Sequence, residues 1–258
     1  MLTPSPPPPT AEQRYCSSDL WVGSAQASQA TLNYAFQGHT IAMAAITDLV
    51  ATQGMGSTPG ARLLFGGCSA GAIGECGPAA PVRARACEPG AEPGVRAREG
   101  AMNNMDYVAE LVASLAPSVQ VQGFLDAAAL VDVYPAGNGW SWGADDEPLQ
   151  TMIAAMYAMV DPVVPPACAS LYSGVDAWKC IFPAYRMPML ATPLFVTWAQ
   201  FDSFQLGLLM DNYVPETAGQ LAFAEKYQQA VLAAIATLPP GTGIFSTTCF
   251  VHCLTGHR

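Results

Sequence analysis

Short apolar runs recur along the chain between longer mixed segments, and they predict β-strands. They span residues 19–23, 62–66, 120–125, 193–198 and 244–251. The runs at 120–125 and 193–198 have the continuous apolar character of strands that a parallel sheet buries on both faces.

Between these runs, apolar residues recur at the three- and four-residue spacing of amphipathic helices. Residues 31–50 show a helical pattern, and another covers 216–238, where Pro239-Pro240-Gly241 stops it. A further helical stripe precedes the strand at 120–125 and consists of Met105, Val108, Val112 and Leu115. Strands that alternate with helices at this spacing predict an α/β fold with a mainly parallel sheet.

Two segments depart from this pattern. Residues 1–12 begin with a proline-rich stretch, which favours an extended and disordered tail. Residues 75–100 hold four prolines, four glycines and four arginines, and no residue larger and more apolar than valine. We interpret 75–100 as a low-complexity surface insertion or a gene-model artefact, rather than a designed lid, within one domain over 13–258. It interrupts a helix that is expected to start near Ser69.

Composition narrows the possible functions. The 258 residues are 51% hydrophobic, which is enough for a large core, and the formal net charge is −10. This acidic balance argues against nucleic acid or an anionic membrane surface as a partner. No apolar run is long enough to predict a transmembrane helix.

Eight cysteines are more than a reduced cytosolic enzyme of this size usually needs. No Cys/His cluster has zinc-site spacing, so disulfides in an oxidising compartment are the better interpretation and no metal or other cofactor is expected. The start of the chain lacks the basic and then apolar pattern of a secretory signal.

Gly67-Cys68-Ser69-Ala70-Gly71 matches the G-x-S-x-G motif, directly after the run at 62–66. In this motif a serine occupies a sharp strand-to-helix turn that exposes its hydroxyl group. Small neighbouring residues allow the strand, turn and helix to pack closely. The motif predicts Ser69 as a nucleophile and the backbone N–H of Ala70 as a donor to an oxyanion.

A nucleophilic serine requires a histidine base. His252 follows the last predicted strand, which is where this fold carries its histidine. His39 lies inside a helical pattern and is interpreted as a packed or surface residue, and His257 is a weaker candidate beside the C-terminus.

The base in turn needs a carboxylate that orients it. Asp202 follows the strand at 193–198 and gives the order Ser69, Asp202, His252 that is expected of an α/β-hydrolase. Asp126 also ends a predicted strand and is the rival acid; a helix N-cap or turn is the structural alternative for Asp202.

Seven collinear blocks of the chain resemble the pectin acetylesterase and Notum family of carboxylesterases. The blocks read YCSSDLWVG, NYAFQG, LLFGGCSAGAIG, NNMDYVAELV, PPACASLYSGVDAWKCIF, WAQFDSFQL and CFVHC. The similarity covers nearly all of the chain except its proline-rich start and residues 75–100. It implies an α/β-hydrolase-like fold, a serine esterase and a mostly secreted or cell-wall location.

The resemblance carries roles to individual residues. Ser69 matches the family's nucleophile, Asp202 its acid and His252 its base. Cys168 and Cys180 match a disulfide, and Cys16 is expected to lack its partner. Asp126 matches the aspartate of an Asp-x-Gly block whose glycine is Ala128 here.

The resemblance also implies that early strands and a Gly-Gly-containing oxyanion loop of the family precede this chain. The first hypothesis is a serine carboxylesterase that removes acetyl groups from cell-wall polysaccharide or cleaves other O-acyl esters. The alternatives are a Notum-like protein-lipid deacylase, and a catalytically impaired relative that binds glycan without the oxyanion loop. Acyl length and oligomeric state stay open.

Overall fold

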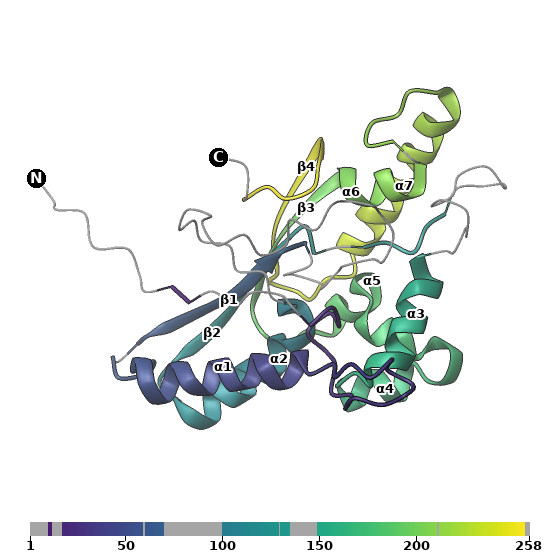
Figure 1. Ribbon diagram of the computed structural model, residues 1–258. Helices are drawn as coiled ribbons and strands as arrows, with labels where there is room; N and C mark the ends of the chain where they lie inside the picture. Colours follow the sequence, from purple (N-terminus) through teal and green to yellow (C-terminus); the bar gives the residue numbers. More distant parts are fainter. Residues whose placement is uncertain are drawn as a thin grey trace, which may run out of the picture.

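The computed structural model describes residues 10–11, 17–58, 60–69, 100–128, 130–134, 149–210 and 212–255 (Figure 1). The strands in these ranges are β1 (Arg62–Cys68), β2 (Gln120–Asp126), β3 (Leu194–Asp202) and β4 (Gly243–Val251). The α-helices are α1 (Gly38–Gln53), α2 (Ala101–Leu115), α3 (Leu149–Val160), α4 (Pro166–Leu171), α5 (Pro183–Arg186), α6 (Ser203–Met210) and α7 (Ala218–Ile235). Two short 3₁₀-helices are η3 (Gly174–Ile181) and η4 (Met187–Met189).

The four strands form one parallel sheet in the order β1-β2-β3-β4. Because the strands are parallel, their carboxyl ends meet at one edge of the sheet. The register places Cys68 beside Asp126, and Asp126 beside Thr197. The α/β fold with a mainly parallel sheet, which the apolar runs predict, is confirmed.

The core lies between one face of the sheet and the helices. This face presents Phe65, Leu125, Val196 and Trp198, all of which are at most 5% exposed. Helix α2 packs on β1 and β2, α1 packs on α2, and α7 packs on β3 (Figure 1). The helices thus hold the strands in place behind the edge where their carboxyl ends meet.

The opposite face of the sheet differs from the expectation of burial on both sides. Leu64 is 67% exposed, Phe195 42% and Phe245 54%, and Phe195 stacks on Phe124 at the same face. Within the described residues, the helices that pack on the sheet cover the other face, so these side chains keep contact with solvent.

The start of α7 is stabilised by a local capping interaction. Thr217 caps α7 by accepting a hydrogen bond from the backbone N–H of Gln220, whose side chain bonds back to the Thr217 N–H. This reciprocal capping box satisfies donors that a helix start leaves unpaired. It explains why α7 starts within one residue of the capping threonine.

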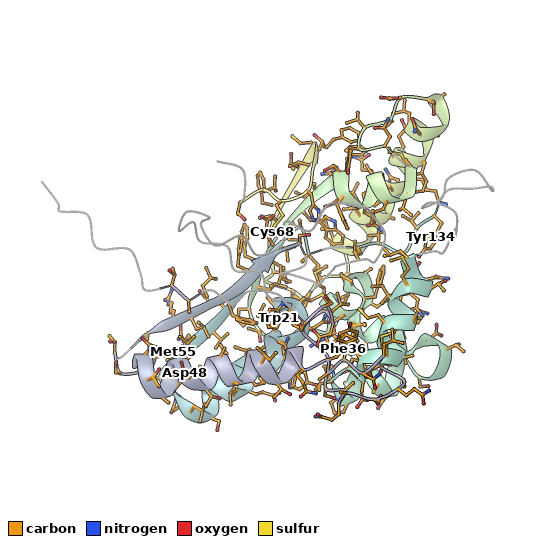
Figure 2. The ribbon with its side chains drawn as sticks, viewed as in Figure 1. Trp21, Phe36, Asp48, Met55, Cys68 and Tyr134 are labelled. Carbon is orange, nitrogen blue, oxygen red and sulfur yellow. A yellow bond between two sulfur atoms is a disulfide. The ribbon has the colours of Figure 1, made fainter. Side chains whose placement is uncertain are left out.

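The strand expected at 19–23 is wrong. These residues form a turn, with only a single antiparallel bridge between Gly23 and Pro162. The Asp19 carboxylate accepts hydrogen bonds from the backbone N–H groups of Trp21 (3.0 Å) and Gly38 (2.7 Å). Trp21, which is labelled in Figure 2, is 1% exposed, so the apolar run reflects burial and not a strand.

The helix expected over 31–50 is α1, and it begins only at Gly38. Leu32 and Asn33 have φ of 52° and 63°, in the left-handed region that a right-handed helix excludes. The Thr31 hydroxyl bonds to the backbone of Ser28, which favours a turn over a helix there.

The proline-rich tail expected at 1–12 and the insertion expected at 75–100 fall almost wholly outside the described residues, so both stay predictions. Residue 100 is described, and α2 begins directly after it. None of the described helices has the length and apolar character needed to cross a membrane.

Candidate active site

Ser69 directly follows β1 and begins the site. Its φ is 56°, a left-handed backbone conformation that residues other than glycine rarely adopt. Gly66 lets the strands approach each other before this turn, because a Cβ atom there would lie 2.1 Å from the Phe124 carbonyl oxygen. This local geometry is the strained turn that the G-x-S-x-G motif predicts.

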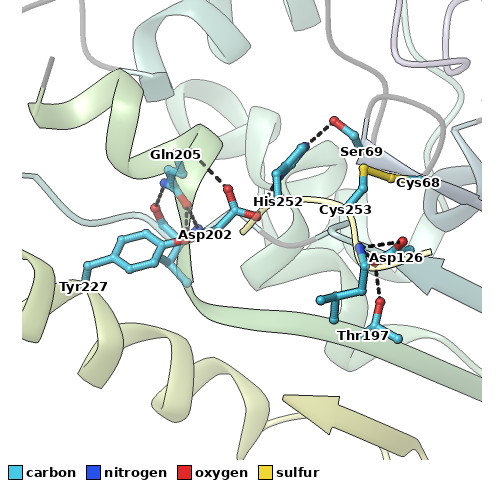
Figure 3. A network of polar contacts seen from close by, with 11 residues as sticks. Cys68, Ser69, Asp126, Thr197, Asp202, Gln205, Tyr227, His252 and Cys253 are labelled. Carbon is cyan, nitrogen blue, oxygen red and sulfur yellow. Dashed lines mark hydrogen bonds and ion pairs between the residues drawn. A yellow bond between two sulfur atoms is a disulfide. The ribbon is translucent and has the colours of Figure 1, made fainter. Parts of the chain in front are cut away.

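His252 lies one residue beyond β4 and contacts the two other candidate residues (Figure 3). Its Nε2 atom lies 2.5 Å from Ser69 Oγ, and its Nδ1 atom lies 2.7 Å from Asp202 Oδ2. The tautomer that fits this network carries the proton on Nδ1 and accepts the serine hydroxyl proton at Nε2. The Phe204 ring, 4.9 Å away between centroids, packs against the imidazole.

Asp202 ends β3 and is 1% exposed. Its Oδ1 atom accepts a hydrogen bond of 3.0 Å from the backbone N–H of Gln205, which leaves Oδ2 directed at the imidazole. The helix-cap alternative for Asp202 and its contact with His252 therefore occur together: one oxygen serves each.

Gln205 links the start of α6 to the surrounding core. Its amide group donates to the Val131 carbonyl and accepts from the Val131 N–H, and it also accepts a 3.1 Å bond from the Tyr227 hydroxyl. Burial, and then the nearby Asp202 carboxylate, raise the pKa of Tyr227 well above its usual value of 10.0. The phenol therefore stays protonated and remains a donor to Gln205.

Asp126, the rival acid, contacts neither the imidazole nor Ser69. Its carboxylate accepts a hydrogen bond from the Thr197 hydroxyl (Figure 3). It also accepts hydrogen bonds from the Leu254 N–H and from both the N–H and the hydroxyl of Thr255. The Nδ1 atom of His252 is occupied by Asp202 instead. Sequence reasoning placed Asp126 at the correct edge but did not identify these partners.

Two disulfides lie in the described chain. Cys168 is joined to Cys180, the pair that the family resemblance implies. Cys68 is joined to Cys253, a pair that sequence reasoning missed. Since these cysteines immediately precede Ser69 and follow His252, convergence of those two residues was the signal that would have predicted the bond.

Several predicted residues cannot be placed. Ala70 (the expected oxyanion donor), Cys16 and His257 lie outside the described residues. His39 lies in α1, where its Nδ1 atom is 2.7 Å from Asn104 Oδ1, as suits a packed helix residue. The described Cys68, Asp126 and Cys253 group closely enough to hold a metal, but the disulfide removes both thiolates.

The serine, histidine and aspartate converge from the carboxyl ends of β1, β4 and β3. A parallel α/β sheet with this constellation at that edge is the arrangement of α/β-hydrolase-like proteins. The sequence model of the pectinacetylesterase family matches residues 11–83 and 98–258. The chain therefore belongs to the pectinacetylesterase family. The match has a gap between residues 83 and 98, inside the segment 75–100 that we interpret as an insertion.

Individual relatives agree with the family match. Pectin acetylesterase 11 of Arabidopsis thaliana is 26% identical over an alignment 260 residues long, which covers 94% of this chain and 56% of the relative. Palmitoleoyl-protein carboxylesterase NOTUM of Mus musculus is 28% identical over 243 residues, 92% of this chain and 41% of the relative. The chain spans about half the length of these curated relatives.

A solved structure shares the fold. The structure of the Wnt deacylase Notum from Drosophila superposes with a TM-score of 0.70 at 22% sequence identity. The similarity covers 93% of this chain and 58% of that chain.

Proposed function

We propose that this chain is a serine carboxylesterase that hydrolyses O-acyl esters, with Ser69 as nucleophile, His252 as base and Asp202 as the acid that orients the base. The observation that carries the proposal is the continuous hydrogen-bonded chain from Ser69 Oγ through the imidazole to the buried Asp202 carboxylate. Family membership supports the same reaction class.

Acylation follows from this geometry. Ser69 Oγ attacks the ester carbonyl carbon while His252 Nε2 takes the hydroxyl proton, and Asp202 stabilises the imidazolium that forms. The tetrahedral intermediate collapses and breaks the bond to the alcohol oxygen, which receives the proton from His252. The alcohol leaves, and the acyl group remains bonded to Ser69.

Deacylation repeats these steps with water. His252 takes a proton from the attacking water, a second tetrahedral intermediate forms, and its collapse returns the proton to Ser69 and releases the carboxylic acid. The oxyanion of each intermediate needs backbone donors, and the Ala70 N–H stays our candidate for the first of them.

We propose an acetylated cell-wall polysaccharide as the substrate, outside the cell. The description of the matched family and the Arabidopsis relative support acetyl ester hydrolysis. The two disulfides favour an oxidising, extracellular compartment. With a net charge of −10, a neutral acetylated glycan suits the chain better than a highly charged polyanion.

A protein-lipid deacylase is the second candidate, because the mouse relative is a palmitoleoyl-protein carboxylesterase. Comparing hydrolysis of an acetylated glycan with that of a palmitoleoylated peptide separates the two. Faster turnover of the lipidated peptide would overturn the polysaccharide assignment and leave the esterase proposal intact.

A fluorophosphonate probe tests the esterase proposal itself. We expect the folded wild-type chain to be labelled on Ser69, and Ser69→Ala to remain unlabelled. Circular dichroism controls for folding in both proteins. A wild-type chain that is folded, unlabelled and inactive on 4-nitrophenyl acetate would refute the proposal for this chain and favour a binding-only relative.

A further inference from the structure

Asp126 is a fully buried carboxylate at the end of β2. Across the sheet, the Thr197 hydroxyl donates to it from β3. From the chain beyond β4, it accepts bonds from the Leu254 N–H at 3.1 Å and from the Thr255 N–H at 2.8 Å. The Thr255 hydroxyl lies 2.5 Å away. No basic side chain among the described residues forms an ion pair with Asp126, so these neutral donors satisfy its negative charge.

Two of the residues that donate to Asp126 lie close to His252 in the sequence. Leu254 and Thr255 follow His252 by two and three residues, beyond the end of β4. There the backbone no longer takes part in the strand pairing that holds β4 to β3. In place of strand pairing, two successive backbone N–H groups donate hydrogen bonds to Asp126. These bonds fix the position of the loop relative to the sheet.

A disulfide also holds the same loop. The disulfide joins Cys253 to Cys68, the residue just before Ser69. Figure 3 shows this disulfide beside the His252 imidazole, with Asp126 below the disulfide. The segment that carries His252 is thus held covalently to β1 and by hydrogen bonds to β2, while its imidazole meets the end of β3.

We propose that Asp126 is a positioning residue for the reaction: it fixes the loop after β4 so that the His252 imidazole bridges Ser69 and Asp202. This inference rests on the proposed function and extends it to a residue that touches neither the imidazole nor the nucleophile. Its contribution is geometric. A misplacement of about 1 Å in such a site costs on the order of 10²-fold in rate.

Asp126→Asn tests the proposal with little change in shape. Its amide NH₂ group cannot accept a hydrogen bond, so some of the four donors lose their partner. We expect kcat per titrated active site to fall by about 10²-fold while KM changes little, because transition-state geometry is disturbed and substrate contacts are not.

The chain offers a matched control in Asp106. Its carboxylate likewise accepts bonds from two successive backbone N–H groups, of Ala191 and Thr192, and from the Thr192 hydroxyl, but on the loop before β3. Asp106→Asn removes the same kind of contact away from the site, and it also removes the ion pair between Asp106 Oδ2 and the buried Arg186. We expect it to lower thermal stability and to leave kcat per active site unchanged.

A spectroscopic readout makes the test independent of turnover. The Nδ1 proton that His252 donates to Asp202 should give a far-downfield NMR resonance in the wild type and in Asp106→Asn. We expect it to be broadened or lost in Asp126→Asn. A wild-type chain without esterase activity would refute the proposed function, and this resonance would still decide the role of Asp126.

If Asp126→Asn does not fold, two threonine variants that each remove a single hydrogen bond provide the same test. Thr255→Val removes one bond to Asp126, and Thr192→Val removes the corresponding bond to Asp106. We expect only Thr255→Val to lower kcat and broaden the resonance. Equal kcat values and an unchanged resonance in the Asp126 and Asp106 variants, or in the two threonine variants, would overturn the proposal.

Discussion

Asp126 and Asp202 are both buried, and each ends a parallel strand at the same edge of one sheet. Asp202 directs one oxygen at the His252 imidazole. All the described hydrogen bonds of Asp126 instead go to Thr197 on β3 and to Leu254 and Thr255, on the loop after β4 that carries His252. The difference comes from the chain beyond β4. Its side chain at 252 reaches β3, and its backbone at 254 and 255 reaches β2.

The comparison shows that a carboxylate at the end of a strand does not by itself identify the catalytic acid. The role of the carboxylate also depends on which atom faces it, and the path of the loop after β4 across the edge of the sheet determines that atom. Both aspartates lie at carboxyl ends of parallel strands, and only their hydrogen-bond partners distinguish the orienting acid that we propose for Asp202 from the positioning residue that we propose for Asp126.

The largest expected effect separates the two aspartates directly. Asp202→Asn keeps the shape of the side chain but favours the wrong imidazole tautomer, so we expect kcat to fall by about 10⁴-fold. The Asp126→Asn variant should be about 10²-fold slower than wild type. Steady-state hydrolysis of 4-nitrophenyl acetate, normalised to labelled sites, measures both. The reverse ranking would reassign the acid.

The two disulfides allow a similar comparison, between a bond beside Ser69 and His252 and a bond elsewhere in the chain. In a chain-entropy estimate, removing Cys68–Cys253, with a sequence separation of 185, lowers the free energy of unfolding by about 5 kcal/mol; for Cys168–Cys180, with a separation of 12, the loss is about 3 kcal/mol. We expect only the Cys68→Ala/Cys253→Ala variant also to lose activity, by up to about 10²-fold, because it releases the histidine loop.

Denaturant unfolding and ester turnover on the two double-alanine variants test this expectation. The Cys168→Ala/Cys180→Ala variant is the control, since its disulfide lies away from Ser69 and His252 in the structure. Equal losses of kcat per folded molecule in the two variants would show that the Cys68–Cys253 bond has no special part in positioning His252.

The smallest effect concerns the support of Asp202. Tyr227→Phe removes the hydroxyl that donates to Gln205, so we expect a loss of about 1 kcal/mol in stability at neutral pH. Because the pKa of Tyr227 is raised in the folded state, the unfolded phenol ionises first as the pH rises. The wild type therefore loses this contribution to stability above pH about 10.

Unfolding curves below and above that pH test the sign. The stability difference between wild type and Tyr227→Phe should shrink as the pH rises, since phenylalanine cannot ionise. A difference that stays constant or grows would contradict a raised Tyr227 pKa. No corresponding effect is expected on the Asp126 side, where the donors are threonine hydroxyls and backbone N–H groups.

The sheet was predictable because its strands are short apolar runs that end at chemically distinct residues. Residues 120–125 and 244–251 were each identified to within one residue of β2 and β4. The run at 19–23 misled because burial against the core produces the same apolar letters as a strand. Its turn is set by bonds from Trp21 and distant Gly38 to Asp19, which no local pattern encodes.

The site was predictable in its residues more than in its supports. Strand ends and chain order pointed to Ser69, Asp202 and His252, and the structure brings their side chains into contact. The Cys68–Cys253 bond and the contacts of Asp126 with Leu254 and Thr255 join residues more than 120 positions apart, and both depend on where the loop after β4 lies. Periodicity carries no information about that path.

The left-handed backbone at Ser69 has a consequence for how sequences of this kind change over time. Glycine adopts that conformation without the steric penalty that a side chain incurs, so a serine there costs some folding free energy. A lineage released from selection for ester hydrolysis would be free to exchange the serine for glycine. Under the proposed function, a glycine at this position in a related sequence would indicate that ester hydrolysis has been lost there.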